Sequence, residues 1–408
     1  MTNTPRRRRR LSARTRGAAI DYGSALRAAR DANTATTPQI LAHAAAAIGA
    51  TDLVVYLIDF GQTLLEPLPD HSAHASVPTT ETVATTMAGR AFVDQQVTTA
   101  DRDDGVRVWV PIVEGSDPTG VLAFTLPAVN DEILRSCEEL GMFAGYLIVA
   151  HARTTDLYNL YRRRRSMSLA ASMQWDLLPP LVLKAGVVTI AGLVEPAYDV
   201  GGDCFDYAVN GSVLDVAIMD AMGHGLGSAM ISSLAMGCYR HDRREGRSLE
   251  AMHSALGAAI LARYRDHSFA TGLLGRLDLG TGAFTWTNAG HPRPLLIRNG
   301  RVITELVSKP TPPWGIEGAP PTVATEALEP GDSVLFFTDG VTEARTPEGD
   351  FFGVDRLVDL TNRYASDLLR PDGILRRLVA SVRDHQRSDS LADDATVVLV
   401  RWDGPGGA

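Results

Sequence analysis

The sequence predicts a mixed α+β protein with a small α/β domain, a helical linker, and a larger domain of antiparallel sheets covered by helices. Its 408 residues, 45% of them hydrophobic, suffice for about two to three domains that each bury a core. Apolar runs of strand length recur between turn signals in two stretches of the chain. In the second stretch the strand-like runs follow one another and the helix-like segments stand in separate blocks. That order is typical of antiparallel sheets with outer helical layers.

The charge distribution separates the first residues from the rest of the chain. The net charge is −9, yet residues 1–20 contain seven arginines and no acidic residue. We therefore expect residues 1–21 to form a disordered basic tail, and the acidic remainder not to bind nucleic acid. The cysteines form no CxxC pair, which excludes a disulfide scaffold and a cysteine-built zinc site; they are Cys137, Cys204 and Cys238.

The longest uncharged apolar stretch covers residues 140–150. It is shorter than the ~20 residues that a membrane-spanning helix requires, so no transmembrane segment is expected. The residues that follow the basic start are too polar for a secretory signal. We therefore expect a cytoplasmic protein, which also agrees with the cysteine content.

The first domain is predicted to cover residues 22–128. Helix-like composition marks residues 40–48 and a short segment at residues 88–92. A continuous apolar run at residues 53–58 is typical of a buried strand, and residues 106–113 alternate as a half-buried strand does. The turn cluster at residues 115–120 connects the latter to a returning strand at residues 121–126, so that the two form a hairpin.

This order of elements resembles a GAF-type sensory domain. The resemblance rests on the VVYLID strand, the AGRAF helix and the hairpin formed by VWVPIV and GVLAFTL. A PAS-like domain and a purely structural α/β domain are the alternatives. A small molecule or a protein could be the sensor's ligand, but no residue of this region specifies one. All three cysteines follow the region, so it has no cysteine to link a chromophore or ligate haem.

Residues 129–180 are predicted to form a helical linker. Residues 130–178 contain no proline and begin with acidic residues, which favours a helix from about Asp131 to Leu178. The consecutive prolines Pro179 and Pro180 then end it. A helix that joins a sensor to an effector is a common signalling linker, and we expect it to support a homodimer.

The last region, residues 181–403, contains most of the strand signals. Strands are expected at residues 187–193, 213–219, 272–277, 283–287, 295–297, 334–337 and 396–400. Helices are expected at residues 228–240, 249–264, 356–364 and 374–383. The pair Asn299-Gly300 predicts a tight hairpin turn, because both residues tolerate positive φ.

Five short segments of this region place aspartate or a small polar residue at strand ends or turns. They are DVGGDCFD (199–206), DAMGHG (220–225), NAGH (288–291), TDGVTEA (338–344) and DDAT (393–396). Carboxylates together with carbonyls exposed by glycine turns are hard oxygen ligands, which suit Mg²⁺ or Mn²⁺. Each segment alone is typical of an ordinary turn, whereas the ordered set indicates a metal site.

The same segments resemble the motifs of a known family. VGGDCFDY, DAMGHGLGSAM, NAGHPRPLL, FFTDGVTEAR and DDATVVLVR are similar to those of the SpoIIE/RsbU-like branch of the PPM (PP2C) serine/threonine phosphatases. The resemblance covers about half of the chain. It implies a PP2C-like β-sandwich flanked by helices, and hydrolysis of phosphoserine or phosphothreonine with two Mn²⁺ or Mg²⁺ ions. The family usually has serine where Met222 stands, which puts the local geometry of that turn in question.

The resemblance also implies roles for single residues. Asp220 corresponds to the carboxylate that bridges both ions, with the carbonyl of Ala221 beside it, and Asp203 completes the shell of one ion. Asp339 and Asp393 correspond to ligands of the other. His224 and His291 are candidates for the acid that protonates the leaving serine, although an ordinary turn histidine is the alternative for each.

Neighbouring residues have less specific expectations. Asp394 is expected to order the ligands rather than bind metal, and Trp314 to pack over the sheet. Arg293 is a candidate phosphate-binding residue only by its place after His291. The remaining acidic neighbours are expected to serve turns and helix starts; they are Asp199, Asp206 and Glu343.

Three functions therefore compete. The first is a cytoplasmic protein phosphatase under an N-terminal sensor, for which the resemblance implies a phosphorylated anti-anti-sigma (STAS-type) protein as substrate. The second is a pseudophosphatase that binds metal as a signalling module. The third is a phosphomonoesterase for small molecules.

Overall fold

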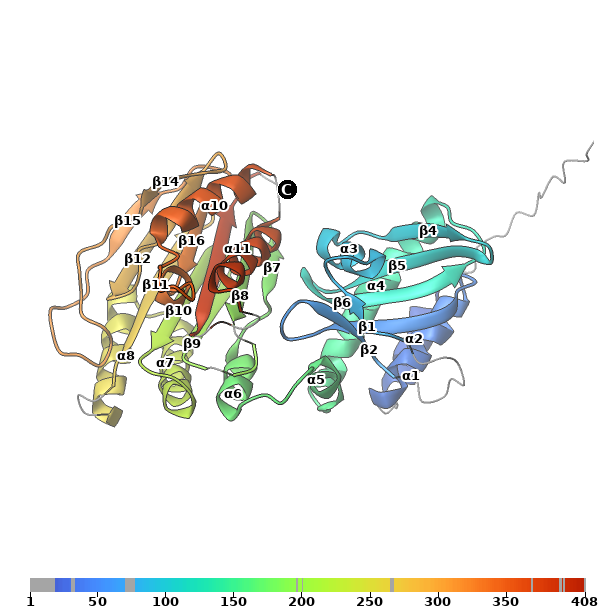
Figure 1. The fold of residues 1–408 in the computed structure, drawn as a ribbon, viewed down its shortest axis with the longest axis horizontal. Helices are drawn as coiled ribbons and strands as arrows, with labels where there is room; N and C mark the ends of the chain where they lie inside the picture. The colour runs from blue at the N-terminus through green and yellow to red at the C-terminus, as the bar shows by residue number, and fades with distance from the viewer. Residues whose placement is uncertain are drawn as a thin grey trace, which may run out of the picture. The chain divides into compact units, whose positions relative to one another are not determined.

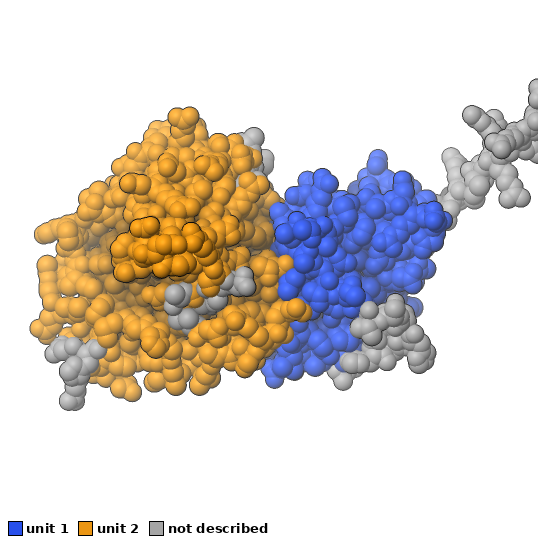
Figure 2. All heavy atoms as spheres, viewed as in Figure 1, with its two compact units in different colours: residues 1–58, 64–114, 119–161 blue, residues 59–63, 115–118, 162–408 orange. Residues whose placement is uncertain are grey.

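The computed structural model describes residues 19–30, 34–69, 78–195, 197–199, 201–264, 268–367, 370–388, 391 and 393–406. The chain divides into two compact units (Figure 2). Unit 1 comprises residues 1–58, 64–114 and 119–161, and unit 2 comprises residues 59–63, 115–118 and 162–408. The arginine-rich start predicted as a disordered tail lies almost wholly outside the described residues.

Unit 1 is built on one six-stranded sheet with the order β3-β2-β1-β6-β5-β4 (Figure 1). The strands are β1 (Thr51–Ile58), β2 (Leu64–Pro67), β3 (Glu81–Thr82), β4 (Thr98–Arg102), β5 (Gly105–Glu114) and β6 (Asp117–Leu126). The expected strands at residues 53–58, 106–113 and 121–126 are thus confirmed. The turn predicted over residues 115–120 is too long, because β6 already begins at Asp117.

The helices of unit 1 cover both faces of this sheet. They are α1 (Tyr22–Arg30), α2 (Thr37–Ala46), α3 (Met87–Asp94), α4 (Asp131–Ala152) and α5 (Leu157–Arg162), with a 3₁₀ turn at Thr34–Thr36. Alternate residues of β1 point to opposite faces. Val55 and Leu57 pack in the core that includes α1, α2 and α4, whereas Tyr56 and Ile58 pack against α3. The sheet of unit 1 therefore carries a separate apolar core on each of its two faces.

The predicted single helix from Asp131 to Leu178 is wrong. The chain forms α4, then α5, then α6 (Leu169–Leu177), with breaks at residues 153–156 and 163–168. Helix α4 packs closely on the sheet of unit 1, where a Cβ at Gly145 would lie 2.0 Å from the carbonyl oxygen of Val113. The separate linker predicted at residues 129–180 is therefore divided, because α4 belongs to unit 1 and α6 to unit 2.

Unit 2 contains two antiparallel sheets (Figure 1). The five-stranded sheet has the order β15-β12-β11-β10-β9 and consists of β9 (Asp203–Asn210), β10 (Val213–Ala221), β11 (Ala270–Asp278), β12 (Ala283–Ala289) and β15 (Ala324–Ala327). The six-stranded sheet has the order β14-β13-β16-β17-β8-β7 and consists of β7 (Val182–Ala185), β8 (Val188–Glu195), β13 (Leu295–Arg298), β14 (Arg301–Glu305), β16 (Ser333–Phe337) and β17 (Ala395–Trp402).

The two sheets face each other across a shared apolar core. Ile218 of β10, Trp286 of β12 and Phe336 of β16 belong to this core, and all three are nearly fully buried. Helices α7 (Leu226–Arg244) and α8 (Leu249–Tyr264) cover the outer face of the five-stranded sheet, and α10 (Val354–Ser366) and α11 (Pro371–Gln386) cover the other. The predicted sandwich flanked by helices is confirmed.

All seven strands and four helices predicted for this region are present, within a few residues of their expected ends. Asn299 and Gly300 have φ angles of 51° and 72°, as the predicted hairpin turn requires. Four strands were not predicted from the sequence, namely β7, β9, β14 and β15, and neither was the short helix α9 (Asp339–Thr342). Among the described residues, no helix has the length and apolarity needed to cross a membrane.

Candidate metal centre

The first two candidate ligands face each other on neighbouring strands. Strand β9 begins at Asp203 and β10 ends at Asp220 and Ala221. The antiparallel register places Asp203 directly opposite Asp220. The N–H of Ala221 donates to the carbonyl of Gly202, at 3.2 Å between N and O, which closes this corner of the sheet. The sequence does not predict the pairing of β9 with β10, because the glycines at the start of this segment indicate only a turn.

The other candidates come from the second sheet. Strand β16 ends at Phe337, and Asp339 opens α9 two residues later. Asp393 and Asp394 stand directly before β17, which pairs with β16. Both Asp339 and Asp393 raise the pKa of Asp220 by charge repulsion, so the acidic residues of the two sheets lie within electrostatic reach of one another at one edge of the sandwich.

The acidic groups at this edge perturb one another strongly. Burial, followed by repulsion from Asp339, Asp393 and Asp394, raises the pKa of Asp220 to about 7. Burial and repulsion from Asp220 and Asp394 raise the pKa of Asp203 well above its ordinary value. Without a cation, this edge therefore holds protons that ordinary aspartates release near pH 4.

Asp394 holds the turn that precedes β9. Its Oδ2 atom accepts N–H groups from Gly202, at 2.6 Å, and from Asp203, at 3.2 Å. Burial raises its pKa to about 6, although these two hydrogen bonds act in the opposite direction. These contacts agree with the expectation that Asp394 orders the ligands rather than binding metal.

Two residues to which the sequence assigned no contact with the site position Asp203. The Thr338 hydroxyl donates to Oδ2 of Asp203 at 2.7 Å and accepts the backbone N–H of Thr396 at 2.9 Å. From α6, the Gln174 side-chain amide donates to the backbone carbonyl of Asp203. The signal for Thr338 was its place between a buried strand and Asp339, where a small hydroxyl side chain can reach the neighbouring strand.

The donor set suits a hard divalent cation. It consists of carboxylates that repel one another, and a cation between them would relieve that repulsion. However, within the ranges that the structure describes, no three histidine, cysteine or acidic side chains converge closely enough to form a ready-made ligand group. The ligand set Asp203, Asp220, Ala221, Asp339 and Asp393 therefore stays a prediction.

The two histidine candidates lie in different environments. His291 is buried, its Nδ1 atom lies 2.9 Å from the Thr271 hydroxyl, and its backbone exchanges two hydrogen bonds with the Asn288 side chain. Burial lowers the pKa of His291 to about 3, so its imidazole is neutral and serves the turn. His224, in contrast, is exposed between Gly223 and Gly225, whose φ angles are 88° and 76°.

The remaining polar candidates are engaged elsewhere. Asp206 forms ion pairs with Arg240 and Arg243, and Asp199 forms one with Arg165. Arg293 pairs with Glu305 at 3.3 Å, with both side chains about half exposed. Asp206 lies within β9 and not in a turn or at a helix start, so the role expected for it is wrong, although it is a structural residue. The ion pair with Glu305 gives Arg293 a partner other than phosphate.

Trp314 packs as predicted. Its side chain is 1% exposed and lies edge-on to His253 in the core beneath α7 and α8. Its backbone pairs with Ala270 at the start of β11. The loop that carries Trp314 is thereby fixed to the five-stranded sheet.

The C-terminal part of the chain is similar to known proteins. Residues 210–403 match the family model described as stage II sporulation protein E (SpoIIE). Protein IcfG of Synechocystis sp. is 26% identical over 267 residues, which cover 58% of this chain and 41% of that protein. Phosphoserine phosphatase RsbU of Bacillus subtilis is 23% identical over 284 residues, which cover 69% of this chain and 83% of that protein.

A solved structure shows the same fold. The SiaA PP2C domain of Pseudomonas aeruginosa superposes with a TM-score of 0.50 and 22% identity, covering 57% of this chain and 94% of that domain. The chain spans only about two fifths of IcfG, so most of that relative has no counterpart here. Residues 210–403 are therefore similar to the SpoIIE family, and unit 2 has the fold of a PP2C domain.

Proposed function

We propose that unit 2 is a metal-dependent protein phosphatase that hydrolyses phosphoserine or phosphothreonine. The single observation that supports this most is the edge of the sandwich where Asp203 and Asp220 face each other and the acids of the second sheet raise the pKa of Asp220. A phosphate ester is itself anionic, so this edge would repel it without a cation. The similarity to a phosphoserine phosphatase supports the choice of reaction.

The chain's own residues have separate tasks in this proposal. Asp220 and the carbonyl of Ala221 would hold two Mn²⁺ or Mg²⁺ ions together with Asp203, Asp339 and Asp393. When bound, such ions lower the pKa of a shared water and neutralise charge on the phosphoryl oxygens. Thr338 and Gln174 fix the side chain and the backbone of Asp203, and Asp394 fixes the turn before it.

The leaving serine needs a proton, and His224 is the candidate donor. It is exposed in the turn four residues after Asp220, so a substrate can reach its ring. His291 does not enter the proposal as a catalytic group, because it is buried, neutral and bonded to Thr271. Turnover of His224→Gln on a phosphoprotein and on p-nitrophenyl phosphate tests this: the loss should be larger on the phosphoprotein, because a serine alkoxide needs a proton to leave and p-nitrophenolate does not.

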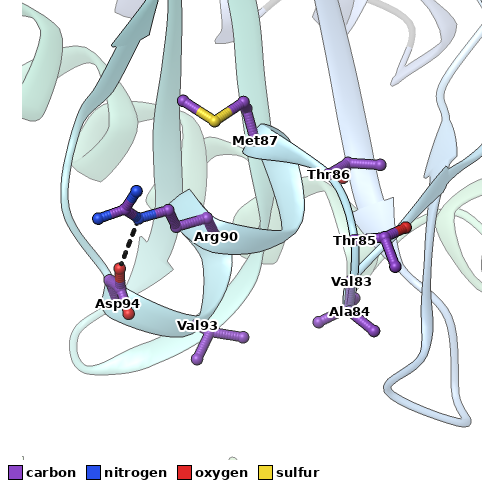
Figure 3. A pocket seen from close by; sticks show the side chains of 8 residues that line it. All are labelled: Val83, Ala84, Thr85, Thr86, Met87, Arg90, Val93 and Asp94. Atoms are coloured by element: carbon purple, nitrogen blue, oxygen red, sulfur yellow. Dashed lines mark hydrogen bonds and ion pairs between the residues drawn. The ribbon is translucent and has the colours of Figure 1, made fainter.

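The substrate in this proposal is a phosphorylated regulatory protein, of the anti-anti-sigma (STAS) type that the resemblance implies. Unit 1 would act as the GAF-like sensor. A pocket of about 470 Å³ lies against α3, but its Arg90 already pairs with Asp94, at 3.4 Å, and it specifies no ligand (Figure 3). The sensor's ligand is therefore left open.

Regulation is proposed to act through α6. This helix carries Gln174, which holds the Asp203 backbone, and Trp175, whose indole N–H donates to the carbonyl of Ala197 at 2.8 Å. A shift of α6 would therefore move a candidate metal ligand directly. We also propose a homodimer, which light scattering at micromolar concentration tests, since a monomer would contradict it.

The test of the reaction uses a substrate trap. His224→Gln protein with Mn²⁺, which keeps every candidate metal ligand and lacks the proposed proton donor, is used to capture phosphoproteins from a lysate. The captured phosphosites are mapped and then offered to the wild-type chain. Mn²⁺-dependent release of phosphate from them supports a protein phosphatase. Release from p-nitrophenyl phosphate alone would instead support a small-molecule phosphomonoesterase, and release from neither would support a pseudophosphatase.

A further inference from the structure

Three large apolar side chains are exposed beside the candidate metal centre. Met222, Leu226 and Met230 have exposed fractions of 40%, 46% and 43%. Most apolar side chains of their size in unit 2 are buried in its cores. We refer to Met222, Leu226 and Met230 as the α7 patch.

The patch is fixed close to the site by the chain itself. Met222 follows Asp220 by two residues, so their Cα atoms are at most about 7 Å apart. The N–H of Met222 donates to the carbonyl of Phe269 at 3.0 Å, which anchors this turn to the strand next to β10. Leu226 and Met230 are four residues apart in α7 and therefore lie on one face of the helix.

The backbone around the patch is uncovered. Gly223, Gly225 and Gly227 alternate with the outward-facing side chains of this segment, and a Cβ placed on any of them would meet no atom within 4 Å. Among the described residues, no atom lies over these three glycines. A partner's backbone can therefore approach the turn closely.

A phosphoserine substrate must cover this surface if it belongs to a protein. Only one methylene group and one oxygen separate the phosphate from the serine backbone, so the residues on either side of the serine must come close to the metal centre. A small phosphoester would leave the α7 patch in water. Exposed apolar side chains beside a site are typical of contacts with another protein, and methionine adapts well to partners of varied shape.

We propose that the α7 patch binds apolar side chains that flank the phosphoserine of the protein substrate, and so selects its sequence context. This inference rests on the proposed function, because it assumes that a phosphoserine reaches the metal centre. The patch is a specificity surface that acts on the flanking residues and takes no part in the hydrolysis.

The test compares two synthetic phosphoserine peptides, one with leucines and one with serines at the four flanking positions. The variant is Leu226→Gln with Met230→Gln. The matched control is Ile303→Gln with Val307→Gln, which changes exposed apolar residues on and after β14, with exposed fractions of 49% and 60%. Each protein is assayed with Mn²⁺ on both peptides and on p-nitrophenyl phosphate, and binding of the labelled leucine peptide is followed by fluorescence anisotropy.

We expect the wild type and the control to prefer the leucine peptide about tenfold in kcat/KM. The patch variant should lose this preference and bind the leucine peptide about tenfold more weakly, while turnover of p-nitrophenyl phosphate stays within twofold. Equal kcat/KM for the two peptides in the wild type, or an unchanged preference in the patch variant, would overturn the inference.

Two further outcomes separate this inference from the proposed function. Binding that depends on the patch, without hydrolysis of any substrate, would refute the phosphatase and leave the surface assignment standing. The patch variant could instead bind the peptide as the wild type does and differ from it in oligomeric state by light scattering. That result would show that the patch joins two copies of the chain, and it would overturn the inference.

Discussion

Acidic residues on the same strands of unit 2 lie in two opposite environments. Along β9 and β10 and beside β16, one set is neutralised by arginine; it comprises Asp206, Asp215 and Asp332. A second set at the edge of the sandwich meets other carboxylates; it comprises Asp203, Asp220 and Asp339. The sequence distance between the two environments is only a few residues.

The arginine-paired set stabilises the fold with the protein's own cations. Asp206 is 2% exposed and lies 2.9 Å from Arg240 and 2.8 Å from Arg243. Asp332 is 1% exposed and accepts three hydrogen bonds from the guanidinium of Arg298. Within the described part of the chain, no arginine or lysine is paired with the edge set or is a cause of its pKa shifts. We propose that a cation from solution takes that place. The difference distinguishes a structural acid from a candidate ligand.

The largest expected effect is the loss of activity when the edge set loses its central charge. Asp220→Asn should reduce Mn²⁺-dependent turnover of p-nitrophenyl phosphate by roughly 1,000-fold, because an amide cannot replace the carboxylate that we propose to serve both ions. Circular dichroism should show an unchanged fold. Residual Mn²⁺-dependent activity above a few per cent would refute the assignment of Asp220.

The opposite substitution tests the paired set. Asp206→Asn should lower the free energy of unfolding by about 3–5 kcal/mol, because it leaves Arg240 and Arg243 without their buried counter-charge. Urea denaturation without metal measures this, with Asp203→Asn as the matched change on the same strand. Asp203→Asn should not destabilise the metal-free chain, since it removes repulsion. Equal destabilisation by both variants would contradict the comparison.

Metal addition should stabilise the folded chain by mass action. At Mn²⁺ concentrations 100-fold above the dissociation constant, the gain is about 2.7 kcal/mol and appears as a higher Tm at neutral pH. The Asp220→Asn variant should lose most of this shift, whereas a variant of the paired set that remains folded should keep it. No shift of the wild type at millimolar Mn²⁺ would count against a metal centre.

The smallest expected effect is the pH dependence of the metal-free chain. The folded-state pKa of Asp220 is about 7, above its value of about 3.9 in an unfolded chain. The folded form therefore binds more protons between about pH 4 and pH 7, and its stability falls as the pH rises through that window. The free energies of unfolding that urea denaturation gives at pH 5.0 and pH 7.5 should differ by roughly 2 kcal/mol in favour of pH 5.0. Asp220→Asn should reduce the difference, and a chain more stable at pH 7.5 would contradict this prediction.

Local patterns were sufficient for most of unit 2. The strand at residues 213–219 and the helix at residues 249–264 follow from apolar periodicity and from turn residues at their ends, and the structure confirms both. Strand β9 was missed because its first residues read as a glycine turn and its acidic residues as turn formers. Only pairing with β10 makes this segment a strand.

The linker shows the opposite case. Helix propensity without proline predicts one continuous helix, because propensity is a property of neighbouring residues. The structure breaks it where packing changes. Tyr158 of α5 is buried in the core of unit 1, and its hydroxyl lies 2.7 Å from that of Thr37, whereas Gln174 of α6 reaches Asp203 in unit 2. The sequence of residues 129–180 does not predict these contacts, because their partners lie elsewhere in the chain.

The sequence predicts which acidic residues belong to the candidate centre, since each stands beside glycine or at the end of an apolar run. The sequence does not predict the partner of each acidic residue. Asp203 and Asp206 are three residues apart in one motif, yet one meets Asp220 and the other meets arginines from α7. Those arginines lie 34 and 37 residues further along the chain. The packing of α7 on the sheet determines which charged residues become partners when they are far apart in the sequence. The reason is that Coulomb energy depends on the distance between charges in space and not along the chain.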